Sequence, residues 1–211
     1  MDIEKVIKNL EKNNMKGYFV KSSDEARKLV AELLKKGDTI SCGGSVTLAD
    51  TGIDKLMRSG DYNLLDRSVA GLTAEQIDEI YAKTFMADAY LCSANAVTEN
   101  GELVNVDGRS NRVAAIVYGP KSVICVVSIN KIVPDVKAGF KRVKEVAAPL
   151  NAKRLGCNTP CAKTGKCIAI DGDIADGCLS DARICASYVV SGRQRVKDRI
   201  KVIIVDEKLG Y

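Results

Sequence analysis

Histidine and tryptophan are absent from this chain of 211 residues. Without histidine, catalysis of the Ser-His-Asp and Cys-His types is excluded, as are metal sites with imidazole ligands. Without tryptophan, and with only seven Tyr and three Phe, the sequence offers no stacking platform for single-stranded nucleic acid. These absences narrow the chemistry of the chain without selecting one reaction.

The chain has only a small excess of positive charge: it contains 32 Lys and Arg residues and 27 Asp and Glu residues, which gives a net charge of +5. In the one dense basic stretch, Arg193–Lys201, the cations stand at alternate positions. This spacing is typical of outward-facing side chains where the chain enters a strand. No apolar run approaches the roughly 20 residues that span a bilayer, and the charged start Met1–Lys5 is not a signal peptide. We therefore expect a cytoplasmic protein that binds neither nucleic acid nor membrane.

Helix-like and strand-like segments alternate along nearly the whole chain. Ser22–Glu25 and Thr73–Gln76 have the pattern of capping boxes, and each predicts the start of a helix. Longer helices are expected at 45–59 and 134–152, and buried strands at 39–42, 89–97, 123–129 and 201–206. The turn Asn100–Gly101 predicts a hairpin. The sequence thus predicts a three-layer α/β fold with a largely parallel sheet, in a single domain over residues 1–211.

Cysteine is concentrated near the end of the sequence. Five of the eight cysteines lie between positions 157 and 185: Cys157, Cys161, Cys167, Cys178 and Cys185. Four thiolates can enclose Zn²⁺ or hold an iron–sulfur cluster. The spacing is that of neither a zinc ribbon nor a ferredoxin, so disulfides, redox thiols and reduced structural cysteines remain alternatives. Residues 156–185 break the helix–strand pattern and are expected to form an insertion or clasp within the domain.

A glycine-rich turn follows the strand expected at 39–42. Backbone N–H groups of Gly43 and Gly44 and the hydroxyls of Ser45 and Thr47 could together bind an anion; a tight turn followed by a helix cap is the alternative. No dinucleotide fingerprint occurs in the sequence, so we expect no nicotinamide or flavin on this chain.

Polar side chains also gather around the predicted hairpin. Turn chemistry accounts for Asn100–Gly101 but not for the number of amide and charged residues nearby. The ligand-binding candidates are Asn95, Asn105, Asp107, Gly108, Asn111 and Arg112. Because a guanidinium pairs with a carboxylate or a phosphate, we expect Arg112 to contact a small anionic metabolite.

The chain resembles the LUD-domain family, in particular the lactate utilisation protein C group. The matching segments are 43–48, 94–99, 103–108, 111–115, 118–121, 130–133, 159–167, 183–185, 200–205 and 209–211. The resemblance implies a fold similar to ribose-5-phosphate isomerase, glucosamine-6-phosphate deaminase and CoA-transferases. It also implies that the chain acts with the proteins that oxidise L-lactate to pyruvate, and that its partners include iron–sulfur redox subunits. The chain could also form a homo-oligomer.

The resemblance also bears on the cysteines. Related proteins have their third cysteine soon after the position of Cys167, whereas here the insert 168–177 delays it to Cys178. The resemblance therefore implies a metal-binding quartet of Cys161, Cys167, Cys178 and Cys185, with zinc and iron–sulfur undecided and Cys157 left over.

A further likeness concerns catalysis. Thr98–Gly101 resembles the Ser-Glu-Asn-Gly segment of class I CoA-transferases, whose glutamate attacks a thioester. This likeness makes Glu99 the candidate catalytic nucleophile, with Gly43 and Gly44 as donors to an oxyanion. The leading hypothesis is a lactate-utilisation-type protein with an anion site and a four-cysteine metal site. The alternatives are a free-standing isomerase or CoA-transferase that uses Glu99, and a non-catalytic sensor stabilised by zinc.

Overall fold

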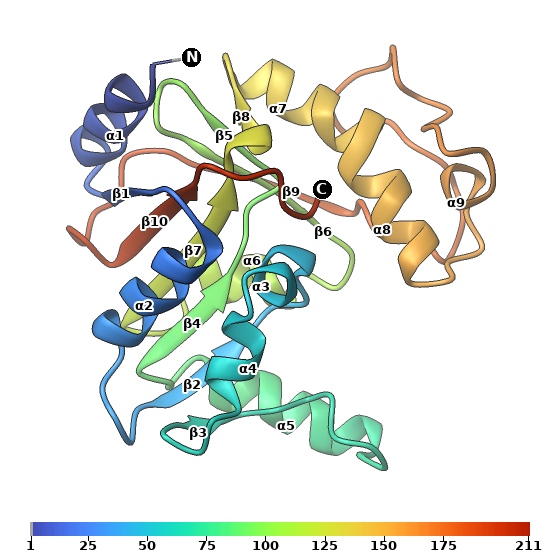
Figure 1. Cartoon of the computed structure of the whole chain (residues 1–211). Coiled ribbons are helices and arrows are strands. Elements are labelled where there is room, and N and C mark those ends of the chain that lie inside the picture. The colour runs from blue at the N-terminus through green and yellow to red at the C-terminus, as the bar shows by residue number, and fades with distance from the viewer. Residues whose placement is uncertain (1) are drawn as a thin grey trace.

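A computed structural model describes residues 2–211. Its main sheet has six strands, and every neighbouring pair is parallel. In spatial order the strands are β1 (Lys16–Val20), β10 (Ile200–Val205), β7 (Ser122–Ser128), β4 (Ala89–Cys92), β2 (Thr39–Cys42) and β3 (Asn63–Leu64). Figure 1 shows β10 between β1 and β7, so strands from the two ends of the sequence pair with each other. The predicted α/β class with a largely parallel sheet is confirmed.

A second, smaller sheet lies beside the first. Its four strands are, in order, β8 (Ile132–Val133), β5 (Ala96–Thr98), β6 (Leu103–Asp107) and β9 (Ser187–Ser191). The prediction of one strand over 89–97 is wrong, because β4 belongs to the main sheet and β5 to the second sheet. Residues 93–95 carry the chain from one sheet to the other. Both halves are apolar and buried, and only the polar residues Ser93 and Asn95 mark the break in the sequence.

Helices and the second sheet cover the two faces of the main sheet. Side chains of β7 alternate: Cys125 packs with α1 (Ile3–Lys12), α6 (Asn111–Val117) and the second sheet, whereas Ile124 packs with the helices of the opposite face. Those helices are α2 (Ser23–Leu33), α3 (Val46–Asp50) and α4 (Ile53–Met57). The layers are therefore helices, the parallel sheet, and a mixed layer of helices and second sheet.

Local sequence signals account for several helix boundaries. Oγ of Ser22 accepts a hydrogen bond from the backbone N–H of Glu25, and Thr73 and Gln76 form a full capping box before α5 (Ala74–Thr84). The single helix expected over 45–59 is wrong: Gly52, in the left-handed region with φ 69°, separates α3 from α4. Glycine adopts this conformation without strain, and the chain turns there.

The helix expected over 134–152 forms, but with a change of pitch. It consists of α7 (Val136–Arg142), the π-helix η2 (Val143–Ala147) and α8 (Ala148–Arg154). Phe140 and Val143 pack on the second sheet, whereas Asn151 and Arg154 line a cavity. The wider π turn thus lies between α7, which packs on the second sheet, and α8, which presents polar side chains to the cavity.

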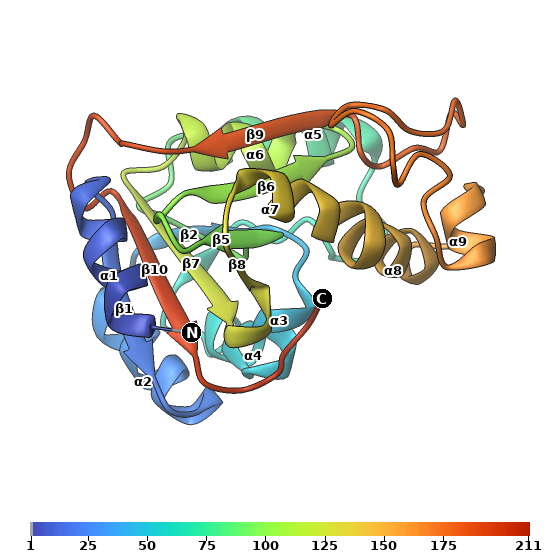
Figure 2. The same cartoon turned by 90° about the horizontal axis from the view of Figure 1, so that it is seen from above.

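The cysteine-rich segment connects α8 to β9. Its only helix in the described chain is α9 (Pro160–Thr164). Figures 1 and 2 both place the segment beyond α8, on the side of the molecule away from α1. A short 3₁₀ turn, η1 (Ile129–Lys131), joins β7 to β8. Among residues 2–211, no helix combines the length and the apolar composition that a membrane span needs.

Candidate functional site

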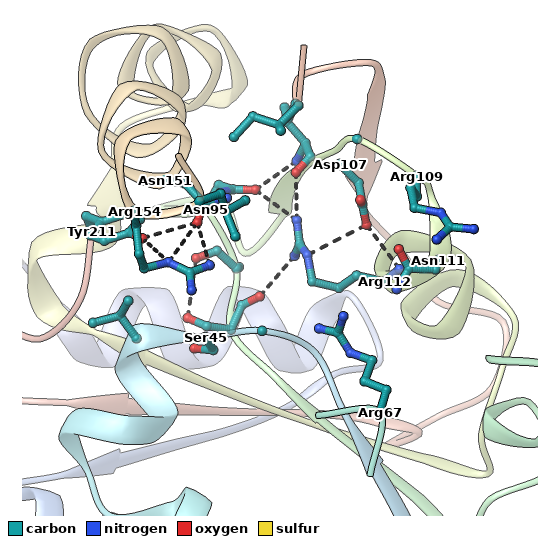
Figure 3. A pocket seen from close by; sticks show the side chains of 18 of the residues that line it. Ser45, Arg67, Asn95, Asp107, Arg109, Asn111, Arg112, Asn151, Arg154 and Tyr211 are labelled. Carbon is teal, nitrogen blue, oxygen red and sulfur yellow. Dashed lines mark hydrogen bonds and ion pairs between the residues drawn. The ribbon is translucent and has the colours of Figure 1, made fainter. Parts of the chain in front are cut away.

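A cavity of about 290 Å³ lies where strands of the main sheet end. Ser45 follows β2, Arg67 follows β3, Asn95 follows β4 and Lys131 follows β7, and all four side chains line the cavity. Helices α6 and α8 and strand β6 supply further walls (Figure 3). The carboxyl ends of parallel strands are the usual ligand-binding edge of an α/β sheet.

Most residues predicted to bind a ligand come together here. Those that line the cavity are Gly44, Ser45, Asn95, Asp107, Gly108, Asn111 and Arg112. The other three lie directly behind the wall. Thr47 accepts a hydrogen bond from Lys131, Asn105 accepts one from Arg112, and a Cβ at Gly43 would stand 3.1 Å from Cδ of Arg112. Residues from the predicted glycine-rich turn and from the polar group around the predicted hairpin therefore form one site.

Arg112 organises the wall of the cavity. Its Nη1 donates to the carbonyl of Ser93 and to Asn105, and its Nη2 donates to Asn95 and to the carbonyl of Val106. Its Nε lies 3.8 Å from a carboxylate oxygen of Asp107, which also accepts hydrogen bonds from the backbone of α6. The guanidinium donors are thus engaged by the protein, and Arg112 holds β6 and the β4–β5 connection in place. Its expected contact with a ligand stays a prediction.

Lys131 is a buried cation at the floor of the site. Its side chain is 3% exposed, and its Nζ donates to Oγ1 of Thr47 at 2.8 Å and to Oγ of Ser93 at 3.1 Å. Burial, followed by the positive charge of Arg142, lowers the pKa of Lys131 from 10.5 to about 8. A cation in this setting gains from an anion in the cavity.

Arg67 and Arg154 converge over the backbone of Gly44. The position that a Cβ would occupy on Gly44 lies 3.3 Å from Nη2 of Arg67 and 4.0 Å from Nη2 of Arg154. Arg67 donates to Tyr81, and Arg154 donates to Asn151 and Tyr211. In Figure 3 both side chains point into the space that Arg112 borders. Because Gly44 has no side chain, a ligand group has room between the guanidinium groups of Arg67 and Arg154.

The lining is strongly positive. Five cations, Arg67, Arg109, Arg112, Lys131 and Arg154, face a single carboxylate, that of Asp107. Among residues 2–211 no ion pair includes Lys131, Arg67 or Arg154. Cations gathered without carboxylates repel one another, and an anionic ligand relieves that repulsion.

Four of these cations, Arg67, Arg109, Lys131 and Arg154, were not predicted from the sequence as site residues. A signal existed for Arg67 and Lys131, because they follow strands that end at the same edge of the sheet. Arg154 lies on α8, far along the chain from the predicted site residues, and nothing in its local pattern separates it from a solvated helical arginine.

Glu99, the candidate nucleophile, lies outside this cavity. Its carboxylate accepts a hydrogen bond from Lys5 at 3.1 Å, and its backbone carbonyl accepts one from Asn9 of α1 at 2.8 Å. The predicted hairpin turn is present, with Gly101 at φ 79°. Glu99 therefore belongs to the docking of the hairpin on α1, and Gly43 and Gly44 are not placed as its oxyanion donors.

The predicted metal-binding quartet lines a second, small cavity. Cys161, Cys167, Cys178 and Cys185 all face it, together with Tyr188, whereas Cys157 does not line it. The donors are of the kind that zinc and iron prefer. In the described part of the chain, however, no three Cys, Asp or Glu side chains are arranged to hold a metal ion, and all eight cysteines are free. The four thiols are not arranged as a metal-binding group in this structure, and the quartet stays a prediction.

Cationic side chains fix the backbone around this second cavity. Nζ of Lys144 donates to the carbonyls of Ala169, Gly172 and Asp173, all in the insert. Arg183 donates to the carbonyls of Ala175, Cys178 and Cys185. Elsewhere, Cys92 and Cys125 are buried in the sheet, and Cys42 is partly buried.

One of the comparisons with known proteins shows the family. A family model described as the LUD domain matches residues 3–205. No curated protein matches the chain. Among solved structures, a DUF162 family protein from Deinococcus radiodurans is similar over 97% of this chain and 99% of its own, at 17% identity and a TM-score of 0.47.

Two further structures are similar in fold. Ribose 5-phosphate isomerase A from Methanocaldococcus jannaschii shares 13% identity over 82% of this chain and 80% of its own, with a TM-score of 0.37. The beta subunit of eIF2B from Chaetomium thermophilum shares 16% identity over 56% of this chain and 44% of its own, with a TM-score of 0.38. The family match covers both sheets and every residue that lines the cavity except Tyr211.

Proposed function

Because this chain belongs to the LUD domain family, we propose that it is a lactate-utilisation-type protein whose main cavity binds a small organic anion. The observation that carries the proposal is the lining of that cavity, in which five cations face one carboxylate. The ligand class that satisfies such a lining is a hydroxy acid, an oxo acid or a phosphate ester. Lactate and pyruvate, which carry a carboxylate beside a hydroxyl or carbonyl oxygen, belong to this class.

Three features support a ligand with one anionic end and one oxygen-bearing end. Arg67 and Arg154 flank the space above Gly44, and guanidinium groups pair with carboxylate or phosphate oxygens. Lys131 offers its ammonium group deeper in the cavity, beside the hydroxyl of Ser93. Asn95 and Asn151, also in the lining, add amide groups that suit hydroxyl or carbonyl oxygens.

The metal part of the proposal is separate from the anion site. Cys161, Cys167, Cys178 and Cys185 would be the ligands, and zinc there would clamp the cysteine-rich segment, whereas an iron–sulfur cluster would carry electrons to or from partner subunits. Since the thiols as placed do not form a metal-binding group, we assign no step at the anion cavity to this metal.

Acyl transfer by Glu99 has less support. A nucleophilic carboxylate must reach the bound substrate, whereas Glu99 pairs with Lys5 outside the cavity. We therefore favour anion binding over a CoA-transferase activity.

Isothermal titration calorimetry tests the anion site. We expect lactate, pyruvate or inorganic phosphate to bind one site per chain, and Arg154→Gln to weaken that binding about tenfold, a loss of about 1.4 kcal/mol. Arg27→Gln is the matched control, because it removes the same charge from an exposed pair with Asp24 on α2. Absence of heat with every anion, or an equal loss in both variants, would contradict the proposal.

A further inference from the structure

Lys131 differs from the other cations of the main cavity in being almost fully buried. The ammonium group has three N–H donors, and the structure gives two of them acceptors, the hydroxyls of Thr47 and Ser93. Among residues 2–211 no carboxylate pairs with it. Because Lys131 also lines the cavity, its remaining hydrogen-bonding position is available to a ligand.

Lys144, the second buried lysine, shows that burial alone does not place hydroxyl groups beside a lysine nitrogen. Lys144 is 5% exposed, and its Nζ donates to three backbone carbonyls in the insert. Its donors are used up in holding a loop, and no hydroxyl stands beside its nitrogen in the described structure. Lys144 is therefore a structural lysine, and it provides a natural comparison for Lys131.

We propose that Lys131 forms a reversible imine with the carbonyl group of an anionic oxo compound bound in the main cavity. The inference rests on the proposed anion site, because Arg67 and Arg154 would hold the carboxylate or phosphate of the same molecule. The structure supplies what the reaction needs: an amine in a cavity, removed from water, with two hydroxyl groups at hydrogen-bonding distance.

The reaction needs no cofactor or oxidant. The unprotonated Nζ donates its electron pair to the carbonyl carbon, and the C=O π electrons move to the oxygen, which takes a proton. The nitrogen then loses its second proton, the hydroxyl group leaves with a proton as water, and a C=N bond forms. One amine and one carbonyl compound give one imine and one water. The hydroxyls of Ser93 and Thr47 are placed to pass these protons between nitrogen and oxygen.

Burial and the charges around Lys131 increase the fraction of unprotonated amine near neutral pH, because they lower the pKa from 10.5 to about 8. Arg142 of α7 and Arg112 of α6 disfavour the ammonium form and act with burial, whereas Cys125 of β7 and Asp50 of α3 oppose them. We expect imine formation to become faster as the pH rises from 7 to 9, because a larger fraction of the amine carries a free electron pair.

Borohydride trapping tests the proposal. The protein is incubated with pyruvate, which carries a carboxylate, or with dihydroxyacetone phosphate, which carries a phosphate, and sodium borohydride then reduces any imine to a stable amine. We expect one adduct per chain, found on Lys131 by peptide mapping. The two compounds distinguish a carboxylate ligand from a phosphate ligand. Lys144→Arg should keep the adduct, and Lys131→Arg should lose it.

The wild-type peptide map decides the question even if Lys131→Arg fails to fold. Calorimetric binding of pyruvate or dihydroxyacetone phosphate without an adduct on Lys131 would overturn the imine and leave the anion site standing. Adducts spread over exposed lysines would overturn it as well. If neither compound binds, the proposed function and the imine fail together.

Discussion

Nη1 of Arg112 donates a 2.6 Å hydrogen bond to Oδ1 of Asn105, a side chain with no exposed surface. This contact joins α6 to β6 at the wall of the main cavity. The same guanidinium also reaches the carbonyls of Ser93 and Val106, so one side chain satisfies acceptors on the β4–β5 connection and on β6. A lysine ammonium cannot match this planar set of donors.

Arg112→Lys should therefore destabilise the fold. Each buried acceptor left without a donor costs about 1–3 kcal/mol, so we expect the free energy of unfolding to fall by roughly 3 kcal/mol in urea titrations. Arg109→Lys is the matched control, because Arg109 forms an exposed pair with Asp78 and should change stability by less than about 0.5 kcal/mol. Equal effects of the two substitutions would contradict the role of Arg112.

Gly44→Ala should weaken anion binding while sparing the fold. The new methyl group would stand 3.3 Å from Nη2 of Arg67, in the space between the two guanidinium groups. We expect about a tenfold loss of affinity for the bound anion, about 1.4 kcal/mol, by calorimetry. Gly192→Ala, where nothing lies within 4 Å of the added Cβ, should leave affinity unchanged. Unaltered binding by Gly44→Ala would show that the anion sits elsewhere.

Lys131 should make stability rise with pH in the alkaline range. Its pKa is about 8 when folded, against an ordinary value of 10.5. Below pH 8 both states are protonated and the burial penalty is fully present; between about pH 8 and 10.5 the unfolded chain binds more protons, so this group adds stability as the pH rises. The gain approaches about 3 kcal/mol.

Lys131→Met, which cannot titrate, isolates this effect from the other lysines and tyrosines. Urea unfolding at several pH values should show the wild type gaining stability relative to the variant above pH 8. Parallel curves for the two proteins from pH 7 to 10.5 would mean that Lys131 is not perturbed by burial.

Glu99→Gln should have little effect. The substitution removes an ion pair with Lys5, whose side chain is 52% exposed, and such pairs contribute about 0–1 kcal/mol. We expect unchanged anion affinity and a shift in unfolding free energy within that range. Loss of an acyl-transfer activity in this variant, with stability intact, would restore Glu99 as the catalytic residue.

Cys161→Ser and Cys157→Ser form a matched pair for the metal prediction. Cys161 faces the cavity of the quartet and Cys157 does not. In protein purified without oxygen, we expect stoichiometric zinc or iron that is retained in Cys157→Ser and lost in Cys161→Ser, with a lower melting temperature. Elemental analysis and a visible spectrum decide between the two metals. A wild-type protein without either metal would remove the quartet as a site.

The predictions from sequence succeeded where the signal was local. The Thr73–Gln76 capping box and the Asn100–Gly101 turn each depend on residues within one turn of chain, and both are present in the structure. Seven of the ten predicted ligand-binding residues line one cavity: Gly44, Ser45 and Asn95 follow strands of the main sheet, and the other four lie at the end of β6 and on or just before α6.

What the sequence did not show depends on tertiary arrangement. The break at Ser93–Asn95 between two sheets is marked in the sequence only by two polar residues, and the strand partner decides where each half pairs. Arg154 reaches the cavity through the position of α8, which also brings Asn151 there. The hydroxyl groups that hold Lys131 come from residues 38 and 84 positions away in sequence, Ser93 and Thr47.

Strand β1 pairs with β10 and with no other strand of the main sheet. During synthesis, residues 16–20 leave the ribosome long before residues 200–205, so β1 has no strand partner until β10 has been made. Helix α1, which packs beside β1, is made early as well. Contacts so distant in sequence form slowly. Until β10 arrives, both edges of β1 lack the hydrogen-bonding partner that one of them has in the folded sheet.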